Sequence, residues 1–251
     1  MDIESRNKLK KEIKAVLEKI FGKNGEKSFN VGASRKKDDS IVTLVDLEIS
    51  AIVHKMFPDF RIYCEETAQE WSKQSDLRLD RGIILDPIDG TSSLAKGCHE
   101  CVVSFALSDG AKPYGWIFNP FTGFEIYSED NFVKPVHQPD KRLFGFVSRT
   151  ELDKKKLYDS VELSSESVHI APKGSIAYKL GLLAAGACDF VISKEPKNIW
   201  DIAAGTFILN ERGFYLYQND KKIEKLEEVR YDGPLIWCYP EDLKKIRNHF
   251  K

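Results

Sequence analysis

The stretch Asp86-Pro87-Ile88-Asp89-Gly90-Thr91 places two carboxylates three residues apart, directly after an apolar run over 82–85. Pro87 cannot donate a hydrogen bond to a neighbouring strand, and Gly90 permits a positive φ. We therefore expect the chain to leave the strand in a tight turn at this point. Such a turn aims both carboxylates and the Ile88 carbonyl at one point, where a hard cation such as Mg²⁺ finds the oxygen ligands that it prefers.

The same stretch also suits a phosphate group. The backbone N–H groups of Gly90 and Thr91 are placed to face an anion if a helix begins there, and Thr91 adds a hydroxyl. The alternative is a surface turn without function, because Asp, Pro and Gly also cluster in ordinary turns.

Two other acidic positions border predicted elements and supply further candidate ligands. Glu65 and Glu66 come directly after the strand-like stretch 61–64, and Asp201 begins a predicted helix as its N-cap. Each has a structural alternative, since paired glutamates are often solvated and an N-cap aspartate often only satisfies backbone N–H groups. Carboxylates at the ends of two strands nevertheless indicate a sheet edge that collects acidic ligands.

The hydrophobic pattern alternates between helical and strand periods along the whole chain. It predicts helices over 3–21, from Asp46 to just before Pro58, and over 175–187, 201–212 and 241–249. It predicts strands over 61–64, 82–85, 101–108, 114–119, 124–128, 144–148, 190–193 and 235–239. The turns at 109–110 and 120–123 indicate an antiparallel meander. We expect one layered α/β unit.

Length and composition limit the possible classes of protein. The chain has 251 residues, is 42% hydrophobic and carries a net charge of -1. We expect a single domain over 1–251, with approximate halves at 1–140 for metal and phosphate and at 141–251 for the rest of the substrate. The balanced charge gives no bias toward nucleic acid or a membrane surface. The absence of a long apolar run and the five scattered cysteines favour the cytoplasm.

Taken together, the acidic segments resemble the inositol monophosphatase family. The stretch 86–91 is similar to the first signature of that family, and Trp200-Asp-Ile-Ala-Ala-Gly205 is similar to its second. Three shorter blocks also match in order and spacing, namely Val42–Asp46, Cys64–Thr67 and Gly174–Ala177. Five ordered blocks over roughly residues 5–215 form a far more specific signal than any single block.

The resemblance implies a fold, a metal site and a mechanism. The implied fold is a layered αβαβα sandwich of the sugar-phosphatase type. The implied cofactor is two or three Mg²⁺ ions, held by Glu65, Asp86, the Ile88 carbonyl, Asp89 and Asp201.

By the same resemblance, Glu65 and Thr91 help to activate the attacking water, and Asp46 supports the Thr91 hydroxyl. The amides of Gly90 and Thr91 hold phosphate, and Gly174 and Ser175 lie near the substrate. The resemblance also implies a homodimer that acts on a small phosphorylated metabolite, with no nucleic-acid or membrane partner.

The sequence departs from the family pattern on the substrate side. Inositol-specific members carry a glutamate seven residues before the Asp201 position, where this chain has Lys194 followed by Glu195. Either Glu195 takes over the contact to sugar hydroxyls, or Lys194 binds a second anionic group or is simply solvated. The chain is also short between Ser128 and Phe144, where many members have a hairpin.

Three functional hypotheses follow. The first is Mg²⁺-dependent hydrolysis of a small phosphate monoester by metal-activated water, nominally of inositol-1-phosphate. The second keeps this chemistry and changes the substrate to fructose-1,6-bisphosphate, 3′-phosphoadenosine 5′-phosphate or histidinol phosphate. The third is a regulatory binding protein, for example one associated with RNA polymerase, that retains the fold.

Overall fold

The structure is a computed structural model that describes residues 1–21, 34–35, 41–42, 44–74, 77–94, 97–110, 112–132, 141–154, 158 and 161–250. Thr43 and most of the short connection between Ser128 and Phe144 lie outside the described residues. In the described part of the chain, no helix combines the length and the apolar character needed to cross a bilayer.

The first half of the chain forms a five-stranded sheet in the order β3-β4-β5-β6-β7. Its strands are β3 (Ile62–Cys64), β4 (Arg81–Asp89), β5 (Val102–Asp109), β6 (Tyr114–Phe118) and β7 (Glu125–Tyr127). β3 runs parallel to β4, and β4 pairs antiparallel with β5. β5 to β7 form the antiparallel meander that the turn residues predicted. β4 is almost completely buried, because helices cover both faces of this sheet.

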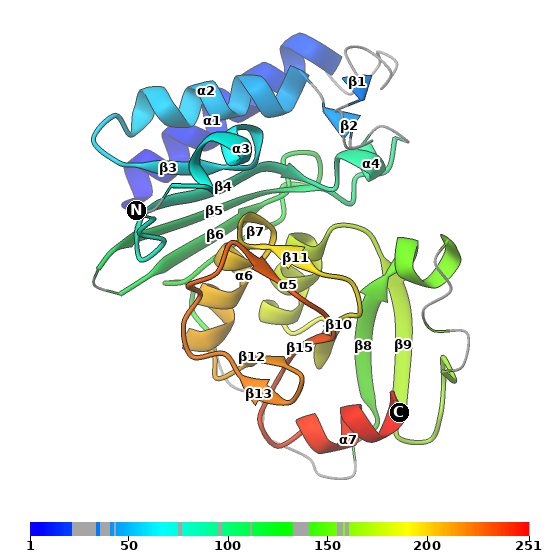
Figure 1. The fold of residues 1–251 in the computed structure, drawn as a ribbon. Helices are drawn as coiled ribbons and strands as arrows, with labels where there is room; N and C mark the ends of the chain where they lie inside the picture. The colour runs from blue at the N-terminus through cyan, green and yellow to red at the C-terminus, as the bar shows by residue number, and fades with distance from the viewer. Residues whose placement is uncertain are drawn as a thin grey trace.

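Two helices cover the outer face of the first sheet (Figure 1). They are α1 (Ile3–Phe21) and α2 (Leu44–Met56). Apolar residues recur along α1 at helical spacing, so they form one buried stripe. This stripe packs with α2 against the sheet and consists of Leu9, Ile13, Leu17 and Phe21.

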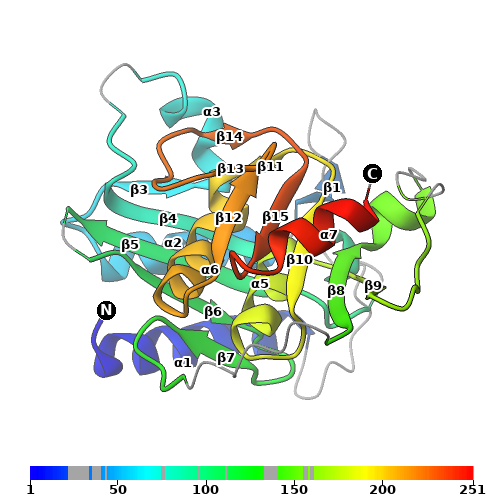
Figure 2. The same cartoon turned by 90° about the horizontal axis from the view of Figure 1, so that it is seen from below.

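The second half forms a six-stranded sheet in the order β13-β12-β15-β10-β8-β9. Its strands are β8 (Leu143–Ser148), β9 (Val168–Lys173), β10 (Phe190–Ser193), β12 (Tyr215–Gln218), β13 (Lys221–Lys222) and β15 (Leu235–Cys238). β8 runs parallel to β9 and β10, whereas β15 runs antiparallel to β10 and β12. The last helix, α7 (Leu243–His249), covers the outer face of this sheet, far from α1 (Figures 1 and 2).

A pair of helices, α5 (Ile176–Ala184) and α6 (Ile199–Glu211), lies between the two sheets (Figure 1). α6 approaches the first sheet closely, because a Cβ atom on Gly115 would lie 2.2 Å from the carbonyl oxygen of Ala204. The succession of helices, sheet, helices, sheet and helix confirms the predicted αβαβα sandwich.

Short elements connect these layers. They are β1 (Ser34–Arg35), β2 (Ile41–Val42), the 3₁₀ helix η2 (Glu65–Thr67), α3 (Ala68–Trp71), α4 (Thr91–Leu94), the π-helical turn η3 (Thr150–Lys154), β11 (Lys197–Asn198) and β14 (Arg230–Tyr231). β11 pairs with β14 directly before α6 begins, so the start of α6 is fixed by a small two-stranded sheet.

The structure corrects three expectations. β4 does not end in a turn at Asp86, but continues as a strand to Asp89. α6 begins at Ile199 rather than at Asp201. β9 and β12 were not predicted, and both belong to the second sheet. The first two corrections change how the acidic residues are held, as described next.

Candidate active site

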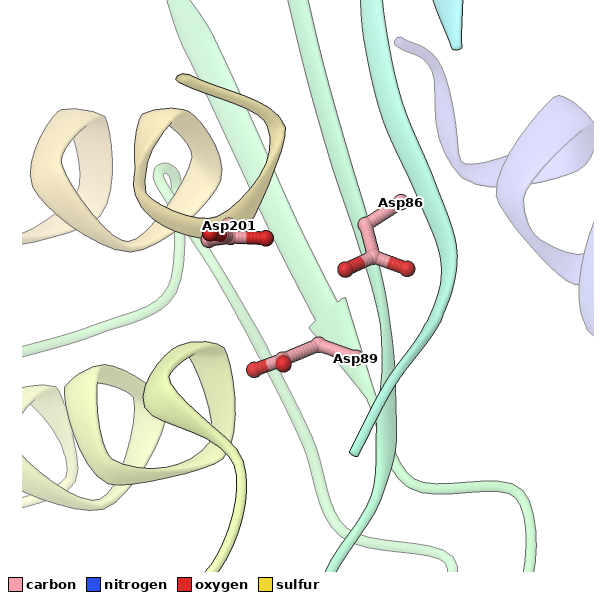
Figure 3. Close-up of side chains that lie close together, drawn as sticks. All are labelled: Asp86, Asp89 and Asp201. Carbon is pink, nitrogen blue, oxygen red and sulfur yellow. The ribbon is translucent and has the colours of Figure 1, made fainter. Parts of the chain in front are cut away.

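Three aspartates from two elements converge between the layers of the molecule (Figure 3). Asp86 and Asp89 come from β4, and Asp201 comes from α6. One carboxylate oxygen of each lies within 4.8 Å of the corresponding oxygens of the other two. The structure thus brings together residues that are more than a hundred positions apart in the sequence.

An irregularity in β4 directs Asp86 and Asp89 to the same side. Along β4 the pairing advances three residues, from Asp86 to Asp89, while along β5 it moves only two, from Ser104 to Val102. An extra residue of this kind reverses the alternation of a strand, so side chains three apart share a face. Pro87 lies within the irregularity, where a missing N–H costs no ladder hydrogen bond.

Gly90 makes the turn that follows this irregularity. Its φ is +97°, a conformation that side chains other than glycine rarely adopt. A Cβ atom there would also lie 2.7 Å from the carbonyl oxygen of Glu100 and 3.0 Å from Cβ of Ser175. The predicted need for glycine at this position therefore has two causes, the backbone conformation and the close approach of the second half of the chain.

The start of α5 holds the carboxylate of Asp89. The Ser175 hydroxyl and the Ala177 N–H both donate to Oδ2 of Asp89, each at 2.6 Å. Ser175 has a φ of 52°, a strained value for a residue other than glycine. These two hydrogen bonds fix one carboxylate oxygen of Asp89, and with it the orientation of the side chain. Ser175, predicted to contact substrate, thus also positions a candidate metal ligand.

Asp201 lies in the first turn of α6, and the prediction that it is the N-cap is wrong. The cap residue is Asn198, whose backbone N–H donates to Oδ2 of Asp201 at 2.9 Å. The carboxylate therefore reaches back from the third helical position, as in a capping box. The Ser104 hydroxyl donates to the Trp200 carbonyl oxygen at 3.1 Å, which ties this turn of α6 to β5.

Burial makes this acidic cluster unfavourable without a cation. Asp86 is only 1% exposed, and its Oδ1 has no hydrogen-bond partner among the residues that the structure describes. Burial, reinforced by the charges of Glu65, Asp89 and Asp201, raises the pKa of Asp86 well above its usual value. Burial and the charges of Asp89 and Glu65 likewise raise the pKa of Asp201. Buried hard oxygen ligands of this kind fit a divalent cation such as Mg²⁺.

The other predicted metal-site residues lie around the three aspartates. Glu65 is partly buried at the start of η2, and its charge acts on both Asp86 and Asp201. Asp46 is buried on α2, and its charge also acts on Asp86. Thr91 begins α4, and Ile88 packs its side chain into the core below α1 and α2. The carbonyl of Ile88 as a ligand and the contact of Asp46 with Thr91 remain predictions.

A pocket of about 310 Å³ opens beside the cluster. Its lining includes Asp89, Asp201, Gly90, Gly174 and Ser175, which join the metal side to the predicted substrate side. A larger cavity of about 540 Å³ lies elsewhere, between the 77–80 segment and α6. The smaller pocket is the better candidate because two of the three clustered aspartates, Asp89 and Asp201, line it.

The two predicted substrate-side residues Lys194 and Glu195 lie in different surroundings. Glu195 lines the pocket. Nζ of Lys194 lies 4.6 Å from the centre of the Tyr158 ring, and Lys194 is not part of the pocket lining in the described part of the chain.

Sequence reasoning missed four charged residues that line this pocket: Arg149, Glu151, Lys179 and Lys197. Lys179 carried a signal, since it falls three residues after Ile176 and four before Leu183, on the apolar face of a helix. The other three carried none, because their neighbourhood depends on how η3 and β11 meet in space.

Comparison with known proteins identifies the family of this chain. The model of the inositol monophosphatase family matches residues 3–234, so this chain belongs to the inositol monophosphatase family, a family of metal-binding phosphatases. The resemblance found in the five sequence blocks is thereby confirmed.

Relatives with different names share this family. The chain is 27% identical to the Nus factor SuhB of Vibrio cholerae over 252 residues, 92% of this chain and 90% of the relative. It is 29% identical to a fructose-1,6-bisphosphatase/inositol-1-monophosphatase of Aquifex aeolicus over 217 residues, 79% of this chain and 78% of the relative. The solved structure of an IMPase of Thermotoga maritima matches with a TM-score of 0.74 at 20% identity, over 99% of this chain and 96% of that one. This last similarity shows the fold.

Proposed function

We propose that this protein hydrolyses a small phosphate monoester in a Mg²⁺-dependent reaction, with a metal-activated water as the nucleophile. The observation that carries this proposal is the convergence of three aspartates, one buried and two partly buried, of which Asp89 and Asp201 line a pocket. One of these aspartates keeps a buried oxygen that has no hydrogen-bond partner among the described residues. Such a site suits a cation, and a cation beside a pocket suits phosphoryl chemistry.

The residues proposed to hold two or three Mg²⁺ ions are Glu65, Asp86, the Ile88 carbonyl, Asp89 and Asp201. When bound, Mg²⁺ polarises a phosphoryl group and lowers the pKa of a coordinated water. Ser175 and the start of α5 hold Asp89 in place for this role, and Asn198 holds Asp201.

The chain's own residues then orient the reactants and move a proton. We propose that Glu65 accepts the proton of the attacking water, and that the Thr91 hydroxyl, which Asp46 orients, holds this water by a hydrogen bond. The amides of Gly90 and Thr91 hold the phosphate oxygens. The rest of the substrate lies along Gly174 and Ser175, with Glu195 and Lys194 as the predicted residues for its hydroxyl or anionic groups.

The nominal substrate is inositol-1-phosphate, and the alternatives are fructose-1,6-bisphosphate, 3′-phosphoadenosine 5′-phosphate and histidinol phosphate. The name of the Aquifex aeolicus relative combines activities on two of these substrates, which supports retaining both as candidates. The homodimer and the cytoplasmic location remain predictions.

A second candidate function is that of a regulatory binding protein. The relative from Vibrio cholerae is named a Nus factor, which supports this alternative. A purely regulatory role gives no reason to keep one buried and two partly buried carboxylates together at a cost in folding free energy. We therefore favour the enzymatic function.

The test is phosphate release from a panel of these esters, with Mg²⁺ or with EDTA. We expect hydrolysis of at least one ester with Mg²⁺, and a loss of at least about 100-fold in Asp89→Asn, because a neutral amide is a poor Mg²⁺ ligand. Asp59→Asn, which neutralises an exposed aspartate after α2, is the matched control and should retain activity. Wild-type rates in Asp89→Asn would refute the metal site, and no hydrolysis of any ester would favour the regulatory function.

A further inference from the structure

The pocket beside the aspartates has a second, cationic part that metal binding does not explain. Three basic side chains line it, those of Arg149, Lys179 and Lys197. A substrate whose remainder carries only hydroxyl groups gives no reason for three cations near its binding site. The three cations differ in how they are held and in the hydrogen-bond donors that they have left for a ligand.

Lys197 is held in place by Glu151 without being saturated by it. Its Nζ lies 3.5 Å from Oε1 of Glu151, which is a long contact, and the Lys197 side chain is 16% exposed. The buried Glu151 carboxylate already accepts hydrogen bonds from Ser193 Oγ at 2.6 Å, the Lys194 N–H at 2.9 Å and the Tyr158 hydroxyl at 3.0 Å. Since an ammonium group has three N–H donors, Lys197 retains donors for a ligand in the pocket.

Like Lys197, Arg149 is held by a carboxylate and has hydrogen-bond donors left for a ligand. Its Nη2 donates to Oε2 of Glu100 at 2.6 Å, while 40% of its side chain is exposed. The Gly174 N–H donates to the same Glu100 oxygen at 2.8 Å, so the anchor itself is fixed to the second half of the chain. A guanidinium group has five N–H donors in a plane, and such a group binds phosphate oxygens in pairs.

Lys179 is buried, so it adds positive charge to the pocket without being a direct contact for the ligand. It is 2% exposed, and its Nζ donates to the Lys173 carbonyl oxygen at 3.2 Å. The buried Glu151 carboxylate faces both Lys179 and Lys197, and the charges of Asp89 and Glu100 also act on Lys179. Glu195, which also lines the pocket, offers an acceptor for hydroxyl groups.

We infer that Lys197 and Arg149 bind a second phosphate group on the substrate, so that the preferred substrates are small sugar or nucleoside bisphosphates rather than monophosphates. This inference rests on the proposed function and specifies the substrate class of the same site. Glu151 is a positioning residue in this assignment, because it holds Lys197 toward the pocket. A small volume, acceptors for hydroxyls and two cations with spare donors together describe a compact polyol that carries a second dianion.

The test compares esters that differ only in the second phosphate. Two such pairs are fructose 1-phosphate with fructose 1,6-bisphosphate, and adenosine 3′-phosphate with adenosine 3′,5′-bisphosphate. For each pair, kcat/KM is measured with Mg²⁺, and the ratio of bisphosphate to monophosphate is the readout. In the wild type we expect a ratio of at least about 10 in one pair, which corresponds to about 1.4 kcal/mol of differential binding.

Substitutions then test which residues cause the higher kcat/KM of the bisphosphate. We expect Lys197→Ala and Arg149→Gln each to bring the ratio close to 1, mainly by raising KM for the bisphosphate. Lys197→Arg should restore most of the ratio, which a merely structural role of Lys197 would not predict. Lys112→Ala is the matched control, because Lys112 is also paired with a glutamate, at 3.0 Å from Oε1 of Glu211, but lies outside the pocket. Lys112→Ala should leave kcat and KM unchanged for the monophosphates and for the bisphosphates.

The outcomes separate this inference from the proposed function. If Mg²⁺-dependent hydrolysis is present and is lost in Asp89→Asn, but the wild-type ratio is close to 1 in both pairs, the second-phosphate site is refuted and the phosphatase stands. A ratio that survives in Lys197→Ala but is lost in Lys194→Ala would also refute the assignment. If none of the four esters is hydrolysed while inositol-1-phosphate or histidinol phosphate is, the second-phosphate site is refuted and the phosphatase stands. No hydrolysis of any ester of the full panel would overturn both proposals.

Discussion

Asp86 combines nearly complete burial with a carboxylate oxygen that no donor among the described residues satisfies. Asp89, by contrast, has one oxygen fixed by two short hydrogen bonds from the start of α5. The carboxylate of Asp89 is thus held by hydrogen bonds from the protein, whereas the carboxylate of Asp86 has an oxygen that a bound cation would satisfy. We expect the difference to appear in stability before any substrate is added.

We therefore predict that Mg²⁺ stabilises the wild type and that Asp86→Asn removes this effect. At a Mg²⁺ concentration of about 100 Kd, linkage gives about 2.7 kcal/mol of added stability. In EDTA, Asp86→Asn should be at least as stable as the wild type, because the substitution removes a buried, unsatisfied charge. Calorimetric Tm values with Mg²⁺ and with EDTA measure both effects. Equal Mg²⁺ shifts in the two proteins would contradict a site at Asp86.

The sequence predicted that the acidic residues meet, because each lies at a recognisable element end or belongs to a family signature. Asp86, Asp89 and Asp201 meet as expected. Lys197 and Glu151 were not foreseen, because each is an ordinary charged residue in its own segment. Their roles arise only where η3, β10 and β11 meet, and no local pattern encodes that meeting.

At the scale of single elements, the register of β4 and the close approach of α6 set the site geometry. The prediction that β4 ends at Asp86 was wrong, because Pro87 is accommodated by an irregularity instead of a turn. β9 and β12 escaped prediction, since 168–173 ends in Pro-Lys and 215–218 is a short aromatic and polar stretch. Pairing with neighbouring strands decided their structure, as is common for short strands.

Gly115 on β6 allows the close approach of α6 to the first sheet. Because a Cβ atom there would lie 2.2 Å from the Ala204 carbonyl oxygen, Gly115→Ala must push α6 away from the sheet. We expect a loss of about 1–3 kcal/mol in the free energy of unfolding, measured by urea denaturation. We also expect weaker Mg²⁺ stabilisation, because α6 carries Asp201.

The control for this experiment is Gly123→Ala. Gly123 has a φ of +77° but open space around a Cβ atom, so alanine there strains the backbone without moving α6. It should cost about 1–2 kcal/mol and leave the Mg²⁺ response intact. An undiminished Mg²⁺ response in Gly115→Ala would show that the position of α6 does not control the metal site.

At the scale of the whole molecule, the two sheets share one hydrophobic core. A single cluster includes Tyr63, Ala106 and Ile117 from the first sheet, and Val191 and Trp237 from the second. α5 and α6 lie between them, and Asp89 of the first half is hydrogen-bonded to Ser175 of the second. The halves at 1–140 and 141–251 are therefore expected to depend on one another for stability.

We predict that the chain unfolds in one cooperative transition. Trp71 and Trp116 lie in the first half, and Trp200 and Trp237 lie in the second, so tryptophan fluorescence reports on both. Fluorescence and far-ultraviolet circular dichroism should give the same denaturation midpoint in urea. Two separated transitions would contradict a single domain over 1–251.

The most direct test of the central claim is a crystal structure of the protein with Mn²⁺ and inorganic phosphate, with Mn²⁺ located by its anomalous scattering. We expect Mn²⁺ bound by carboxylate oxygens of Asp86, Asp89 and Asp201, with a phosphate oxygen in contact with the metal and with the Gly90–Thr91 amides. An absence of anomalous signal between these three aspartates, at Mn²⁺ concentrations that support hydrolysis, would contradict it.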